Sequence, residues 1–178
     1  LDMLSSDPAT VIHSGWLTAA LPSSAAILSG GRRVMTEVSD FSQKMGAAGP
    51  VDLSQMRATA AWQAVWGVTD FTLYYGPNDR SAEDYRAYCD FVGRLNAVLK
   101  PAKLDRRVLL YYPIHDLWEE YLPVPEPLKL GSQSKRAQSL VGSFMRLGQT
   151  LQRTQIPFTI VDHEYLAAAQ IDAQGRLS

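Results

Sequence analysis

A single carboxylate stands out in the first quarter of the sequence. Glu37 follows residues 34–36, which carry no charge, and precedes Val38, so the acid lies within a run that we expect to be buried. Burying a carboxylate costs free energy unless the group is paired or takes part in chemistry. Two interpretations of Glu37 are therefore open. It forms an ion pair with Arg32, Arg33 or another arginine, or it is a catalytic carboxylate.

Aromatic side chains form a second group, because their rings can cover the apolar faces of a sugar. Tyr75 ends a predicted strand, and His13 and Trp16 lie close together near the N-terminus, where they could line the mouth of a site. Each also has a structural interpretation, since strand tyrosines commonly pack in the core and a lone histidine commonly has a structural hydrogen bond. Trp62 and Trp66 are one helical turn apart, which favours packing over contact with a substrate.

The third group is a run of polar and aromatic residues behind a predicted strand, made up of His115, Asp116, Trp118, Glu119 and Glu120. Side chains of these types bind metals or exchange protons. Residues this close in sequence do not converge on one point without help from elsewhere in the chain, so we interpret the run as a solvated loop face. The sequence thus assigns no metal ligand and implies no cofactor.

Several motifs with well-understood chemistry are missing. The sequence has no Gly-x-Gly-x-x-Gly after a strand, no Walker loop, no Gly-x-Ser-x-Gly elbow and no His-Glu-x-x-His. Nucleotide binding, serine hydrolysis and zinc proteolysis have no local support. Cys89 is the only cysteine, which excludes an internal disulfide. The weakest hypothesis is a small-molecule or amidotransferase-like enzyme that works through Cys89, because this residue lies inside a strongly periodic helix, where a buried thiol is usually inert.

Short apolar runs alternate with longer stretches of helical periodicity, which is the pattern of βα units. We expect strands at residues 33–38, 71–75, 107–113 and 156–162, and helices at 19–28, 52–67, 81–99 and around 140–151. Apolar residues recur at helical spacing in the last two helices, at Tyr85, Tyr88, Val92, Leu95 and Leu99 and at Leu140, Phe144, Leu147 and Leu151. Residues 9–13 are a further candidate strand and 115–121 a short helix. The order predicts an α/β fold with mainly parallel strands, in which the third strand is covered on both faces. Functional groups gather at the C-terminal ends of such strands.

The composition is that of an ordinary globular protein. Of the 178 residues, 46% are hydrophobic, and 17 basic against 18 acidic residues leave a net charge of -1. Nucleic acids and anionic membranes attract clustered Lys and Arg, and the sequence has no such cluster, so we expect neither partner. No apolar run approaches the roughly 20 residues that cross a bilayer. The sequence begins at Leu1 without a signal region, and we expect it to be a segment of a larger polypeptide.

Five segments follow one another in a distinctive order: Val34-Met35-Thr36-Glu37, then residues 67–75, 88–96, 108–114 and 158–166. In this order they resemble the later part of large bacterial glycoside hydrolases, nearest to the α-L-rhamnosidase-like enzymes and next to the β-galactosidase-like barrel enzymes. The resemblance implies that residues 1–100 are the C-terminal segment of a (β/α)8 barrel. Residues 105–178 would then be the start of a flavodoxin-like or amidotransferase-like α/β domain.

The resemblance also implies roles for single residues. Glu37 would be a catalytic carboxylate at the end of the seventh barrel strand, and a carbohydrate substrate would contact Tyr75, His13 and Trp16. Glycoside hydrolysis commonly needs two carboxylates. Asp40 is better interpreted as a loop residue, so the second carboxylate would come from an earlier strand, and we expect the 178 residues not to be a complete enzyme. Such hydrolases are commonly periplasmic or secreted.

The alternative is a stand-alone flavodoxin-like interaction or regulatory domain without catalysis. Four βα units within 178 residues could form an open parallel sheet of their own. Cooperative unfolding of the isolated chain would favour this alternative. Part of a barrel, with exposed strands, should instead aggregate or bind a hydrophobic dye.

Overall fold

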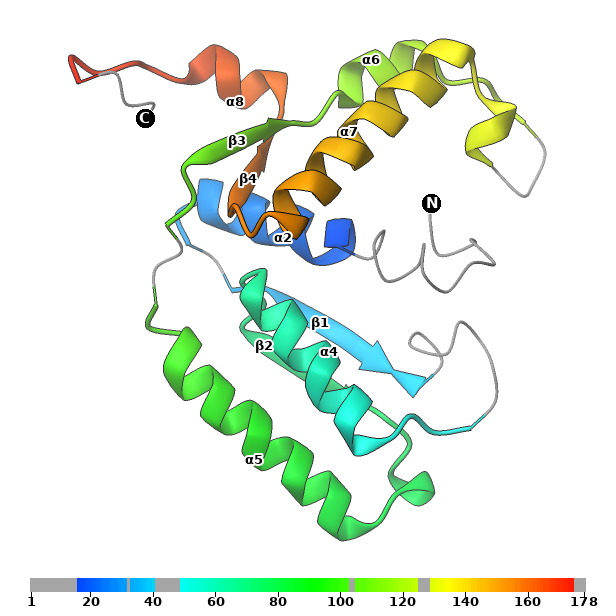
Figure 1. Cartoon of the computed structure of the whole chain (residues 1–178), viewed down its shortest axis with the longest axis vertical. Helices are drawn as coiled ribbons and strands as arrows, with labels where there is room; N and C mark the ends of the chain where they lie inside the picture. The colour runs from blue at the N-terminus through cyan, green and yellow to red at the C-terminus, as the bar shows by residue number, and fades with distance from the viewer. Residues whose placement is uncertain (1–15, 32, 41–48, 103–104, 125–128, 175–178) are drawn as a thin grey trace. The chain divides into compact units, whose positions relative to one another are not determined.

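The computed structural model describes residues 16–31, 33–40, 49–102, 105–124 and 129–174. These residues form a mixed α/β fold with two pairs of parallel strands, as the alternation in the sequence predicts (Figure 1). They divide into two compact units, which lie within residues 15–104 and 105–178 and are named the first and the second unit below. None of the helices within the described residues is long and apolar enough to span a membrane.

The first unit contains two consecutive strand–helix steps preceded by a helix. Its elements are α2 (Trp16–Leu28), β1 (Met35–Ser39), α4 (Leu53–Val65), β2 (Asp70–Tyr74), the 3-10 turn η2 (Pro77–Asp79) and α5 (Ala82–Leu99). β1 and β2 are parallel, with Met35 opposite Asp70 and Ser39 opposite Tyr74. α4 is therefore the crossover helix between two neighbouring parallel strands, which is the βα unit that the sequence predicts.

Both long helices of the first unit begin at the residues that the sequence predicts. The Asp52 carboxylate accepts a hydrogen bond from the Gln55 amide at 2.8 Å. The Ser81 hydroxyl accepts one from the Asp84 amide at 3.0 Å and donates to the Asp84 carboxylate at 2.8 Å. These caps satisfy amides that have no partner within the helix. Gly67, with a φ of 101°, follows α4 in left-handed backbone.

The core of the first unit lies on one face of the strand pair, against α4 and α5. It consists of Val38, Val51, Met56, Ala60, Tyr75 and Tyr88, with Leu53, Phe71, Tyr85, Phe91 and Val92 packed against it. The residues that α5 contributes include three of its predicted periodic positions. Because both helices supply core residues and run beside each other, they cover the same face of β1 and β2 (Figure 1).

α2 begins three residues before the predicted helix and has Pro22 near its middle. Its first residue, Trp16, is completely buried, with its ring centroid 6.1 Å from that of Trp66. The ring of Trp62 lies 6.4 Å from Trp66 in an edge-on arrangement. The interpretation of Trp62 and Trp66 as packing residues is confirmed.

Cys89 lies in the middle of α5, and its side chain is exposed. The expectation of a buried thiol is wrong. Its neighbour Tyr88 is the buried residue of the helix, and successive side chains point about 100° apart around a helix axis. Cys89 is thereby turned away from the core.

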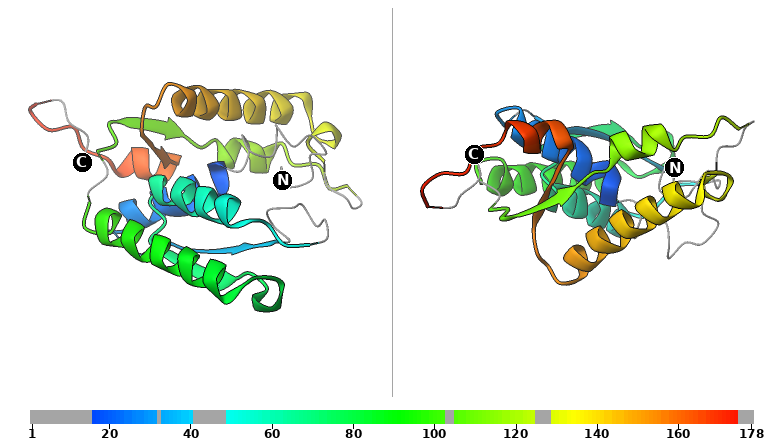
Figure 2. Two further views of the ribbon diagram at one scale, coloured as in Figure 1. Left: turned by 60° about the horizontal axis from the view of Figure 1, so that its bottom comes forward. Right: turned by 90° about the horizontal axis from the view of Figure 1, so that it is seen from above.

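The second unit also contains one pair of parallel strands. Its elements are β3 (Val108–Tyr111), α6 (Ile114–Glu119), the 3-10 turn η3 (Leu130–Ser132), α7 (Lys135–Arg153), β4 (Phe158–Val161) and α8 (His163–Ala168). β3 and β4 are in register from Val108 opposite Phe158 to Tyr111 opposite Val161. α7 packs along β3 (Figure 2). The centroid of its Phe144 ring lies 5.3 Å from that of Tyr112.

The strand that is fully buried in the second unit is β4 and not β3. All four residues of β4 are buried. In β3, Leu109 and Tyr111 are 39% and 40% exposed, so the expectation that this strand is covered on both faces is wrong. Leu109 and Tyr111 lie on one side of β3 and the buried Leu110 on the other. Since the residues on both sides are apolar, the sequence does not indicate which side is exposed.

The buried face of α7 agrees in part with the predicted apolar stripe. Phe144 is buried and Leu140 and Leu151 are half-buried, as the stripe predicts, whereas Leu147 is 57% exposed. Ala137 and Gly148, which are not members of the stripe, are also buried. Periodicity therefore identified the helix and most of its buried face, with Leu147 as the exception.

Candidate functional site

Glu37 is the middle residue of β1, and its side chain is exposed. The expectation of a buried carboxylate at a strand end is wrong. The residues on either side of it face the helices: the Thr36 hydroxyl donates to the Gln63 side-chain oxygen of α4 at 2.7 Å, and Val38 lies in the core. Since side chains alternate along a strand, Glu37 points to the face of β1 and β2 that is turned away from α4 and α5. We call this the Glu37 face.

Arg33, one of the predicted ion-pair partners of Glu37, contacts Asp70 instead. Its guanidinium donates to both carboxylate oxygens of Asp70, and the Lys100 ammonium lies 3.5 Å from the same carboxylate. The hydrogen bonds from Arg33 hold the pKa of Asp70 well below its usual range. Within the described part of the chain, no hydrogen bond or ion pair joins the Glu37 side chain to another residue. Arg32 lies outside that part.

Two residues of β2 share the Glu37 face. Glu37 is opposite Thr72, and Ser39 is opposite Tyr74. Directly paired residues of neighbouring strands project to the same side of the sheet. Tyr74 is 66% exposed, and Met35 on the same face is 62% exposed. The face therefore presents a carboxylate, a hydroxyl group and an accessible phenol ring.

Tyr75, the predicted substrate contact, lies on the opposite side, in the core. It is 2% exposed, with the edge of the Tyr88 ring 5.4 Å away between centroids and the Arg80 guanidinium 4.9 Å from its own centroid. The Tyr85 hydroxyl donates to its carbonyl oxygen at 3.2 Å. This burial does not support contact with a substrate. Alternation in the sequence already separates Tyr74 from Tyr75, and the register shows that Tyr74 is the one on the same face as Glu37.

The structure does not place the two remaining predicted substrate contacts, Trp16 and His13, on the Glu37 face. Trp16 has no exposed surface, because its ring packs against Trp66. A completely buried indole offers no surface to a sugar. His13 lies outside the described residues.

Asp40, interpreted from sequence as a loop residue, is the centre of a closed polar network. Its carboxylate accepts hydrogen bonds from the Val51 amide at 2.7 Å, from the Gly76 amide at 3.3 Å and from the Arg80 guanidinium. The Arg80 hydrogen bonds, together with the two amides, lower the pKa of Asp40 to about 2, against the opposing effect of burial. Asp40 thus joins the segment after β1 to the segment after β2.

The guanidinium of Arg80 is saturated in the same network. Its side chain is 4% exposed and also donates to the Val51 carbonyl at 3.0 Å, to the Gly76 carbonyl at 3.2 Å and to the Met56 sulfur at 3.2 Å. A guanidinium has five N–H donors, and these contacts use them all. Arg80 therefore serves the fold and has no donor left for a ligand.

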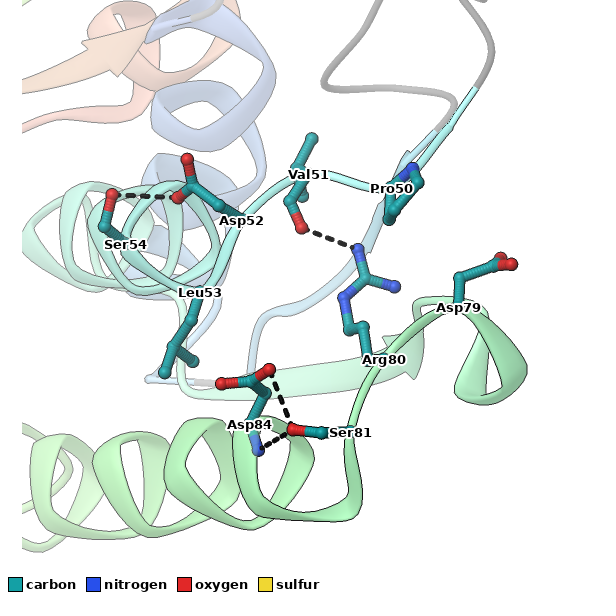
Figure 3. A pocket seen from close by; sticks show the side chains of 9 residues that line it. All are labelled: Pro50, Val51, Asp52, Leu53, Ser54, Asp79, Arg80, Ser81 and Asp84. Atoms are coloured by element: carbon teal, nitrogen blue, oxygen red, sulfur yellow. Dashed lines mark hydrogen bonds between the residues drawn. The ribbon is translucent and has the colours of Figure 1, made fainter.

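A hollow of about 540 Å³ lies beside this network, where α4 and α5 begin (Figure 3). Its walls include Arg80 and the capping residues of both helices. Asp52 caps α4, and Asp84 is bonded to Ser81 at the start of α5. Because these carboxylates sit at the helix N-termini, they repel an anion that would otherwise bind there. The polar side chains that line the hollow therefore hold the starts of α4 and α5 in place, and we assign them no catalytic role.

The run behind β3 is divided by the structure. Asp116 and Glu120 face Arg136 on α7, at 3.8 Å and 3.6 Å, and Glu120 also accepts a hydrogen bond from the Ser134 hydroxyl at 2.6 Å. These carboxylates join α6 and the residue after it to α7. They are partly exposed, and their role is the attachment of neighbouring helices.

His115 belongs to a different cluster, together with His163 and Glu164 of α8. The two imidazole rings are 3.8 Å apart between centroids, and the ligand atoms of the three residues lie within 4.8 Å of one another. His163 and Glu164 are not among the ligand-binding candidates predicted from the sequence. A signal was available, because both follow β4, and the C-terminal ends of parallel strands meet at one edge of a sheet.

Among the polar groups of the described residues, the Asp40–Arg80 network is closed. Glu37 on one strand pair, and His115, His163 and Glu164 on the other, present exposed or half-buried side chains that form no hydrogen bond or ion pair with another described residue. These two groups are able to meet a ligand. Comparison with known proteins identifies no family for this chain. No protein-family model matches it, and no match is found among curated proteins or among solved structures.

Proposed function

We propose that this chain is part of a carbohydrate-active glycoside hydrolase and that Glu37 is one of its catalytic carboxylates. The first unit would be the last part of a (β/α)8 barrel, and the second unit the start of a flavodoxin-like domain. The observation that carries the proposal is the exposure of Glu37 on the face of a parallel strand pair that is turned away from both helices. The order of the segments that resemble such hydrolases adds independent support.

The two faces of β1 and β2 suit opposite sides of a barrel wall. In a (β/α)8 barrel the helices cover the outside of the sheet, and the other face lines the interior. Val38 and Tyr75 face α4 and α5, so they would lie between the barrel sheet and its surrounding helices. Glu37 and Tyr74 would point into the barrel interior. The exposed side chain of Met35 fits this arrangement, since further strands would cover it.

Glycoside hydrolysis assigns a clear role to one such carboxylate. Glu37 would act as nucleophile, or as base on a water molecule, while a second carboxylate protonates the leaving oxygen. Asp40 is not that second group, because Arg80 and two backbone amides occupy its oxygens. The partner would come from another strand of the complete barrel. Tyr74 replaces Tyr75 as the ring that contacts the sugar, because it shares the face of Glu37.

The test uses the complete polypeptide that contains this sequence, assayed against a panel of chromogenic aryl glycosides. Glu37→Gln should lower kcat by at least about 1,000-fold, because removal of a catalytic group of this kind typically costs that much. Glu83→Gln, a matched change at an exposed position of α5, should leave hydrolysis unchanged. Since Glu37 is exposed, its amide variant should fold normally, which circular dichroism checks. Full activity of Glu37→Gln would overturn the proposal and favour a non-catalytic interaction domain.

A further inference from the structure

We propose that His115, His163 and Glu164 form a binding site for a divalent transition-metal ion of the zinc class. The three residues lie within the second unit and take no part in the chemistry proposed for Glu37. They come from two segments about fifty residues apart in the chain, which the fold brings to one place. The site is independent of the proposed hydrolase activity.

The parallel pairing of β3 and β4 produces this convergence. Tyr111 is opposite Val161 at the end of the two strands, and the Tyr112 amide continues the ladder by donating to the Val161 carbonyl at 2.7 Å. His115 follows three residues after Tyr112, as the second residue of α6, and His163 is the first residue of α8. Both histidines are thus carried by helices that start directly behind hydrogen-bonded strands.

The distances suit a metal ion after a small adjustment of side chains. Three ligand atoms bonded to zinc at about 2.0–2.1 Å in tetrahedral geometry are about 3.3 Å apart. In the structure the ligand atoms of the three residues already lie within 4.8 Å of one another. His163 and Glu164 are exposed and His115 is half-buried, so rotation about side-chain bonds can close the remaining gap and an ion can enter.

The chemistry of the donors selects the class of metal. Two imidazole nitrogens and one carboxylate oxygen suit zinc and its neighbours in the first transition row, whereas calcium and magnesium prefer oxygen ligands alone. Three protein ligands leave at least one coordination position for water or another ligand. The three side chains have no hydrogen bond or ion pair with other described residues, so metal binding has no such bond to break.

Two neighbours hold the histidines in place. The Trp118 ring lies 4.6 Å from His115 between centroids, edge to face, and forms one wall of the cluster. The Asp162 carboxylate caps α8 by accepting from the Tyr165 amide at 2.9 Å, which fixes the direction in which His163 and Glu164 leave the strand.

The experiment titrates the full chain, stripped with a chelator, with Zn²⁺ in a calorimeter and with Co²⁺ in a spectrophotometer. The expected result is one equivalent of either ion, with the visible absorption of Co²⁺ bound by nitrogen and oxygen ligands. His115→Ala and His163→Ala should each weaken binding at least 100-fold, and Glu164→Gln at least tenfold. Glu119→Gln, at an exposed position of α6, is the matched control and should leave binding unchanged.

A second variant keeps the proposal testable if an alanine variant fails to fold. His163→Cys replaces the nitrogen ligand by a thiolate, which also binds zinc-class ions. Co²⁺ bound to it should show a new sulfur-to-metal band in the near ultraviolet that the unaltered chain, with its Cys89, lacks. Absence of Zn²⁺ binding at micromolar concentrations, or equal binding by His163→Ala, would overturn the proposal. Neither result bears on Glu37, because metal binding is measured without a glycoside.

Discussion

The two strand pairs carry polar clusters at the same topological position, behind the C-terminal ends of parallel strands, yet the clusters differ in state. Behind β1 and β2, Asp40 and Arg80 bind each other and the surrounding backbone, so no group is left over. Behind β3 and β4, His115 and His163 contact each other only through their rings. A position at a strand end therefore does not identify a functional residue. The number of hydrogen bonds already satisfied within the chain separates a group that holds the fold from one that can bind a ligand.

The largest expected effect comes from breaking the closed cluster. Arg80→Ala leaves the Asp40 carboxylate and the Val51 and Gly76 carbonyl groups without their partner, and removal of one member of a buried pair costs about 3–5 kcal/mol. Urea unfolding followed by tryptophan fluorescence measures the loss, because Trp16, Trp62 and Trp66 all lie in the first unit. Arg94→Ala, at an exposed position of α5, is the control and should stay within about 0.5 kcal/mol. Equal stability of both variants would show that the network is dispensable.

A smaller effect follows from the pH dependence of the same pair. The pKa of Asp40 is lowered from 3.8 to about 2 in the folded chain, so its contribution is fully present above the unfolded value and is lost as the pH falls from about 4 to about 2. With allowance for solvent screening, this contribution is about 1–2 kcal/mol.

Asp40→Asn should abolish that part of the acid destabilisation. The measurement compares the free energy of unfolding of the variant and the unaltered chain at pH 6 and pH 3. The gap between the two proteins should be widest at pH 6 and should narrow at pH 3. A gap that does not change with pH would mean that the Asp40 carboxylate is not specifically stabilised in its charged form. Asp70, whose pKa is also lowered, remains in both proteins and cancels in the comparison.

The sequence predicted the elements of both strand pairs better than it predicted the sites. Helix starts at Asp52 and Ser81 are local signals, because a cap depends on residues three positions apart. The exposure of Glu37 depends on which face the helices cover, and this is decided by the pairing of β1 with β2. The network of Asp40 and Arg80 joins residues forty positions apart, and a charge in a predicted loop gives no hint of such a partner.

The histidine cluster was partly within reach of the sequence. His115 was a candidate, and the strand before His163 was predicted at residues 156–162. What was missing was the pairing of β3 with β4 as direct neighbours, since only adjacent parallel strands bring their following residues within 4.8 Å. Side-chain orientation on helices was predicted in part, since Tyr85, Tyr88 and Val92 of α5 do pack in or against the core. The exposure of Leu147 and Cys89 was not predicted, because packing partners and not periodicity alone decide which face is buried.

The smallest expected effect on stability comes from the helix caps that follow the two strand pairs, and it gives the sharpest contrast between the two polar clusters. Asp52 caps α4 and Asp162 caps α8 by the same contact, a carboxylate that accepts from the amide three residues on, at 2.8 Å and 2.9 Å. Replacing either by Ala should cost about 1 kcal/mol. Only Asp162→Ala should also weaken Zn²⁺ binding, by about tenfold, because it frees the start of α8 that orients His163 and Glu164. Calorimetric titration of both variants with Zn²⁺ measures the difference. Equal Zn²⁺ affinities of the Asp52→Ala and Asp162→Ala variants would show that the cap of α8 has no part in positioning the metal ligands.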